Sequence, residues 1–157
     1  MEYPSRYINV LIDDDSWSDF DYSYLDDVAL MIFKHFCYDE YFFEVCLYLT
    51  GNDKIQKLNL EYRGKNTPTN VLSFEGDLEF SKETPVLLGS IAIAYRYSFD
   101  EAKASNIAFK DHITHLFIHG MLHLLGYDHI KDSDFEKMKS LEVLFLNQLN
   151  IKNPYEE

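Results

Sequence analysis

The eleven residues from His119 to His129 read HGMLHLLGYDH and place histidines at the first, fifth and eleventh positions. An α-helix brings residues four apart onto one face, with Cβ atoms about 5–6 Å apart. His119 and His123 can therefore reach one ion at about 2.0–2.1 Å, the usual Zn–N distance. Gly126 permits the turn that ends a helix, so the chain can fold back and present His129. Three protein ligands leave one tetrahedral position open to water, as in catalytic zinc sites.

The residue after the first histidine is Gly120. In the metalloprotease signature with the same spacing, H-E-x-x-H-x-x-G-x-x-H, that position holds the glutamate that acts as general base. Glycine can neither take a proton nor bind a metal. The sequence therefore keeps the ligand spacing without the peptidase base, which argues against a peptidase.

The histidines are concentrated in this part of the chain, with five of the six between His112 and His129. A lone histidine on an apolar helix is usually a core residue, but a cluster of five is not explained in this way. We expect His119, His123 and His129 to bind the metal, since three imidazoles would otherwise be buried without a stated partner.

The neighbouring polar residues are expected to have roles other than that of a metal ligand. His115 lies eight residues before His123, about 12 Å along a helix axis, so one ion cannot easily join both. We interpret His115 as a residue that supports a ligand or belongs to the core, and His112 as a surface residue. Asp128 could accept the hydrogen bond that fixes an imidazole tautomer, although a simple turn residue fits equally well.

Outward from this stretch, hydrophobic periodicity and turn residues predict four strands and five helices. The strands are expected at residues 7–12, 41–49, 71–74 and 88–94, and the helices at 22–36, 53–63, 98–105, 108–125 and 132–149, the third with a capping box of Ser98 and Glu101. Gly89 suggests a bulge or a close backbone approach. The order predicts an α+β fold with one metal-dependent hydrolase domain over residues 1–157. We expect a mixed sheet of about four strands covered by helices, with the metal site at the end of a central helix.

Composition limits the classes of partner. Hydrophobic residues make up 46% of the 157, and aromatic residues 16%, which indicates a packed globule. The sequence has no apolar run of about 18 residues, so no membrane-spanning helix is expected. The first residues also lack the pattern of a signal peptide. We therefore expect a cytoplasmic protein without a membrane partner. The net charge of −13 disfavours nucleic acid. It still permits a small cationic site beside a metal.

Two cations, Arg63 and Lys65, bracket Gly64 at the expected end of the helix over residues 53–63. Their positions fit a role at a site formed by the following loop. They also suit the dipole at the C-terminal end of a helix, so a structural role explains them equally well.

The histidine stretch resembles the signature H-G-x-L-H-L-x-G-Y-D-H of the YbeY family, bacterial single-strand-specific endoribonucleases of ribosomal RNA maturation and ribosome quality control. The segments LNLEYRGKNTPTNVLSF and LGSIAIA resemble the second and third motifs of that family, in the same order. The resemblance covers residues 58–129 well and the ends loosely. It implies one zinc ion at His119, His123 and His129 and a functional role for Arg63. It also implies single-stranded or ribosomal RNA as substrate, and the ribosome or its small subunit as partner, rather than DNA.

The chain departs from the family pattern at three positions. It has Asn70 in place of the aspartate of T-D-V-L-S-F, Ser90 in place of the aspartate of L-G-D-I, and Glu75 in place of a proline. The loss of two acidic positions weakens any mechanism that needs them as bases. The set of metal ligands is unaffected.

Three functions remain open from the sequence. The first is a zinc-dependent endoribonuclease of small-subunit rRNA maturation and ribosome quality control. The second is another metallohydrolase, acting on a small phosphoester or amide, and the third is a ribosome assembly factor with a structural metal. If the protein is either of the two enzymes, we expect Arg63 to stabilise the negative charge of the transition state. Arg63 and Lys65 would together bind the substrate. We expect both cations at the mouth of a cleft, with the acidic residues elsewhere.

Overall fold

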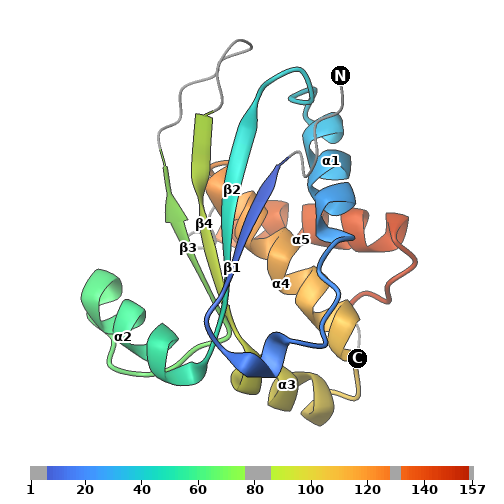
Figure 1. Ribbon diagram of the computed structural model, residues 1–157. Helices are drawn as coiled ribbons and strands as arrows, with labels where there is room; N and C mark the ends of the chain where they lie inside the picture. The colour runs from blue at the N-terminus through green and yellow to red at the C-terminus, as the bar shows by residue number, and fades with distance from the viewer. Residues whose placement is uncertain (1–6, 77–85, 128–131, 156–157) are drawn as a thin grey trace.

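The computed structural model describes residues 7–76, 86–127 and 132–155, which form a four-stranded sheet and its helices (Figure 1). In chain order the elements are β1 (Ile8–Ile12), the 3-10 helix η1 (Asp15–Trp17), α1 (Leu25–His35), β2 (Phe43–Thr50), α2 (Asn52–Arg63), β3 (Val71–Glu75), β4 (Val86–Ala94), α3 (Tyr95–Ala104), α4 (Phe109–Leu124) and α5 (Asp132–Gln148). The strand order is β1-β2-β4-β3, with β3 antiparallel to β4 and the other pairs parallel. The predicted mixed α+β sheet is therefore confirmed, and β2 is an interior strand as expected.

One face of the sheet carries the main hydrophobic core. Helices α1, α4 and α5 lie on this side (Figure 1). Alternate residues of β2 point into the core, and Val45, Leu47 and Leu49 are fully buried there. On the α4 side the core is closed by residues such as Phe117 and Met121. This alternation is what a strand with one face packed against helices requires.

The other face of the sheet is covered mainly at one end. There α2 packs through Ile55 against Leu72, Ala92 and Ala94 to form a small separate core. Figure 1 shows α2 beside the lower end of β3 and β4 rather than along the length of the sheet. The rest of this face carries a groove lined by residues that include Tyr48 and Phe74.

Two glycines allow α4 to lie close to the sheet. A Cβ atom on Gly120 would lie 3.0 Å from Cδ1 of Ile91 on β4. Gly89 has a φ of +157°, and its Cβ would lie 2.4 Å from the Phe74 carbonyl oxygen and 2.5 Å from Cδ2 of Leu124. The strand pairing shifts register beside Gly89, so the predicted bulge and close approach are both confirmed.

The start of α3 differs from the prediction. The helix begins at Tyr95, directly after β4, and Ser98 is a buried residue inside it rather than its N-cap. The Asn52 side chain of α2 accepts a hydrogen bond from the Tyr97 backbone N–H at 3.0 Å and so caps α3 from a distant part of the chain. The short helix therefore needs no capping residue of its own. No helix among the described residues is long and apolar enough to span a membrane.

We predict that Gly89→Ala destabilises the protein more than Gly64→Ala. Both glycines have positive φ values, +157° and +69°, but nothing lies within 4 Å of a Cβ on Gly64. Gly64→Ala should cost about 1–2 kcal/mol from the backbone alone, whereas Gly89→Ala adds an overpacking cost of about 1–3 kcal/mol. Urea unfolding followed by circular dichroism measures both. Equal losses of stability would mean that the close approach at Gly89 is unimportant.

Candidate functional site

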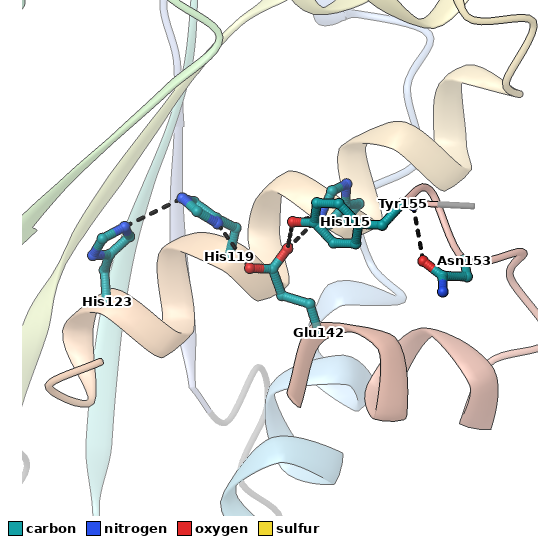
Figure 2. Close-up of polar contacts among 6 residues, drawn as sticks. All are labelled: His115, His119, His123, Glu142, Asn153 and Tyr155. Carbon is teal, nitrogen blue, oxygen red and sulfur yellow. Dashed lines mark hydrogen bonds and ion pairs between the residues drawn. The ribbon is translucent and has the colours of Figure 1, made fainter. Parts of the chain in front are cut away.

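The last two turns of α4 bring His119 and His123 together. Their Nε2 atoms lie 3.2 Å apart, and both rings project from the same side of the helix (Figure 2). The i, i+4 spacing thus produces the facing arrangement of imidazoles that the sequence predicts.

This arrangement fits a zinc ion. Ligand atoms at about 2.0–2.1 Å from a tetrahedral ion are separated by about 3.3–3.4 Å, close to the 3.2 Å between the two nitrogens. Imidazole is also a usual zinc ligand. His129 and Asp128 lie outside the described residues, and within residues 7–76, 86–127 and 132–155 no group of three possible ligands forms a metal site. The three-histidine set therefore remains a prediction.

A buried carboxylate supports the two histidines. Glu142 of α5 is 2% exposed, and its Oε2 atom lies 3.0 Å from Nδ1 of His119. Its Oε1 atom lies 2.5 Å from Nε2 of His115 and accepts a hydrogen bond of 2.7 Å from the Tyr155 hydroxyl. Figure 2 shows Glu142 reaching between His115 and His119, with Tyr155 on the same side. The Glu142 carboxylate therefore links His115 to His119. This link fits the interpretation of His115 as a residue that supports a metal ligand.

The state of Glu142 sets the proton positions on His119. Burial raises the pKa of the Glu142 carboxyl, but hydrogen bonds from His115, His119 and Tyr155 and the charge of His119 outweigh this effect and lower the pKa to about 2. The carboxylate is then ionised at neutral pH and can only accept hydrogen bonds, so Nδ1 of His119 carries a proton. In the neutral imidazole this leaves a lone pair on Nε2, which is the state that a metal ligand needs.

Glu142 and Tyr155 are functional candidates that the sequence patterns do not indicate. Glu142 follows Met138 by four residues and precedes Phe145 by three, and both of these residues are fully buried. A glutamate in the apolar stripe of a helix is the one signal that could have identified it, because carboxylates are rarely buried without partners. Nothing in the local sequence indicates the role of Tyr155.

His112 does not lie at the surface as predicted. Its side chain is 12% exposed, and Nε2 lies 3.0 Å from Oε1 of Glu101 on α3. The Asn70 side-chain amide donates to the same oxygen at 3.0 Å. Asparagine at position 70 can make this contact because it has N–H donors, whereas an aspartate would place a second carboxylate beside Glu101. The contact ties the loop before β3 to α3.

A cavity of about 600 Å³ brings the histidines and the two cations together. It lies where β3, the loop after α2 and α4 meet, and its lining includes His119, His123, Arg63 and Lys65. Gly64 adopts a left-handed conformation, φ +69°, and ends α2 between the two cations. The Arg63 guanidinium donates a hydrogen bond of 3.2 Å to the Ser73 carbonyl of β3. Both cations therefore belong to the same cavity as the two histidines.

The charge near this cavity differs from that of the whole chain. Among the described residues, Glu75 is the only acidic residue that lines it, against Arg63 and Lys65. The net charge of the chain is −13. Most of the negative charge therefore lies away from this cavity in the described part of the chain, as expected.

Comparison with known proteins identifies close relatives. A family model described as Endoribonuclease YbeY matches residues 12–150. The protein named Endoribonuclease YbeY from Dichelobacter nodosus is 49% identical over 112 residues, which cover 71% of this chain and 72% of the relative. The protein of the same name from Francisella tularensis subsp. novicida is 45% identical over 117 residues, covering 73% and 72%. The solution structure of TM1509 from Thermotoga maritima has a similar fold, with a TM-score of 0.56, 24% identity and coverage of 96% and 99%.

We predict that Glu142→Gln changes the acid dependence of stability. The pKa of Glu142 is about 2 against an ordinary value of 4.5. Because the folded value is the lower one, the carboxylate contributes stability that is complete above about pH 4.5 and is lost as the pH falls towards 2. The difference corresponds to about 3 kcal/mol. Glu142→Gln should lose a similar amount at pH 7 and show a smaller further loss on acidification.

Urea unfolding in the presence of a chelator, at several pH values from 7 to about 2.5, measures this effect in the metal-free protein. Glu136→Gln is the matched control, since Glu136 lies on the exposed side of the same helix. An equal acid dependence of Glu142→Gln and the unaltered protein would contradict the prediction.

Proposed function

This chain belongs to the YbeY family of endoribonucleases, and we propose that it is a zinc-dependent, single-strand-specific endoribonuclease. We further propose that it acts in the cytoplasm on ribosomal RNA, in maturation of the small subunit and in ribosome quality control. The observation that carries this proposal is the single cavity lined by His119, His123, Arg63 and Lys65. A metal beside two cations suits a phosphodiester better than an amide.

The metal is assigned to His119, His123 and His129, one ion per chain. When bound, zinc supplies a Lewis acid and a water whose pKa is lowered towards about 7. The protein contributes the orientation of the ligands. The Glu142 carboxylate accepts a hydrogen bond from Nδ1 of His119, with 3.0 Å between Oε2 and Nδ1, so that Nε2 faces His123.

Arg63 and Lys65 bind the scissile phosphate and stabilise the negative charge that grows in the transition state. The Ser73 carbonyl is the one hydrogen-bond partner of the Arg63 guanidinium among the described residues. A guanidinium has five N–H donors, so the others can form the paired contacts that suit phosphate oxygens. Lys65 adds a second positive charge at the same cavity.

Two other functions remain as alternatives. A metallohydrolase of a small phosphoester or amide could use the same cavity, and it would not be hindered by the charge of −13. An assembly factor with a structural metal would have no use for a cation beside the open position of the metal. Arg63 lines the same cavity as the histidines, which favours the two enzymatic functions over an assembly factor with a structural metal.

We predict that the purified protein contains about one zinc ion per chain and that His119→Ala loses it. Two histidine ligands cannot hold the ion as tightly as three. Elemental analysis after dialysis measures the metal content. His35→Ala is the control, because His35 is an exposed histidine on α1. A full metal content in His119→Ala would show that the ion binds elsewhere.

We predict that Arg63→Ala lowers RNA cleavage by roughly 10²–10³-fold, as expected for the loss of a group that stabilises transition-state charge. Its fold and metal content should be unchanged, because Arg63 is exposed. Cleavage of a single-stranded oligonucleotide, with and without a chelator, measures the effect. Lys57→Ala removes an exposed cation from the same helix and should cleave normally. Cleavage that survives both His119→Ala and the chelator would overturn the proposed activity.

A further inference from the structure

A second cavity of about 820 Å³ lies on the face of the sheet opposite α4. We call it the aromatic groove, defined by Tyr48 of β2, Tyr62 of α2 and Phe74 of β3, with Leu58 beside them. The rings of Tyr62 and Phe74 have centroids 5.0 Å apart at an angle of 60°, and Tyr62 is 62% exposed. The groove therefore presents ring surface to whatever enters it.

The aromatic groove is continuous with the cavity of the histidines. Arg63, Ser73 and Glu75 line both. Because side chains alternate along a strand, Phe74 faces α2 whereas Ser73 faces α4, where its hydroxyl lies 3.5 Å from the Gly120 carbonyl oxygen. β3 is an edge strand. A chain bound at the histidines can thus pass around this edge, beside Arg63, into the groove.

The charges in the aromatic groove are balanced. Lys54 and Arg63 line it together with Asp13 and Glu75. A site with this balance does not select for a phosphate, which needs an excess of positive charge. Aromatic rings in a neutral surrounding suit an uncharged planar group, and stacking of bases on such rings is the usual way in which proteins bind single-stranded nucleic acid.

A buried hydroxyl in the aromatic groove indicates a polar ligand. Thr50 is 1% exposed and lines the groove, and its Oγ1 atom has no hydrogen-bond partner among the described residues. A buried hydroxyl without a partner costs free energy, so such groups are rare unless a ligand or a water satisfies them. The polar edge of a nucleobase offers both donors and acceptors to Thr50.

We propose that the aromatic groove binds an unpaired nucleobase next to the scissile phosphate, with its ring against Tyr62 and Phe74 and its polar edge towards Thr50. This inference rests on the proposed endoribonuclease function and adds a physical basis for single-strand selectivity. A base in a duplex must first lose its pairing and stacking, which costs about a few kcal/mol, so an unpaired base enters the groove more readily.

The test is the binding of a short single-stranded RNA in the presence of a chelator, which prevents metal-dependent cleavage. Fluorescence anisotropy gives the Kd, and quenching of a 2-aminopurine base reports stacking. Tyr62→Ala should weaken binding about tenfold and remove the quenching, because it removes the exposed stacking ring. Tyr62→Phe keeps the ring and should retain both. Leu60→Ala is the matched control, since Leu60 is 49% exposed on the same helix and does not line the groove.

Cleavage by the zinc-loaded protein separates the two proposals. One outcome is that RNA cleavage depends on Arg63 and His119 as predicted, but that Tyr62→Ala binds RNA with the same Kd as Leu60→Ala. This outcome would overturn the nucleobase site and leave the nuclease function standing. If the unaltered protein neither binds nor cleaves RNA, both proposals fail. Removal of one base from the oligonucleotide should weaken its binding to the unaltered protein. The same removal should leave the Kd of Tyr62→Ala unchanged, because that variant has already lost the contact with the base.

Discussion

The buried carboxylate of Glu142 is the contact on which the site depends most. A charge removed from water is costly unless donors surround it, and here His115, His119 and Tyr155 provide those donors. The three come from α4 and from the segment after α5, so α5 cannot shift relative to α4 without leaving the carboxylate unpaired. The same interaction that fastens these helices therefore fixes the orientation of His119.

The edge strand β3 is the second organising feature. An unpaired edge is usually a liability because its N–H and C=O groups can pair with other chains. Here the Arg63 guanidinium binds the Ser73 carbonyl on β3, which occupies part of the edge and holds the guanidinium between the two cavities. The same contact positions the cation that the proposed reaction needs.

The features that the sequence predicted well depend on local spacing. The four strands follow from short apolar runs, and the facing of His119 and His123 follows from the pitch of a helix. The features that it missed depend on contacts between distant residues. Asn52 caps α3 from 45 residues away, and Glu142 reaches His115 from 27 residues away. No periodicity within one element records such pairings, so the local pattern predicts Ser98 as a cap and gives no role to Glu142.

Packing and chemistry together explain why Gly120 follows the first histidine. The sequence alone indicates only that a general base is missing at this position. In the fold, a Cβ there would lie 3.0 Å from the Ile91 side chain, so a glutamate would have to displace α4 from β4 or point into the core. The cavity that His119 and His123 line is bordered instead by β3 and the loop after α2. Arg63 and Lys65 are the cations that line this cavity, so a substrate bound at the histidines lies within reach of both.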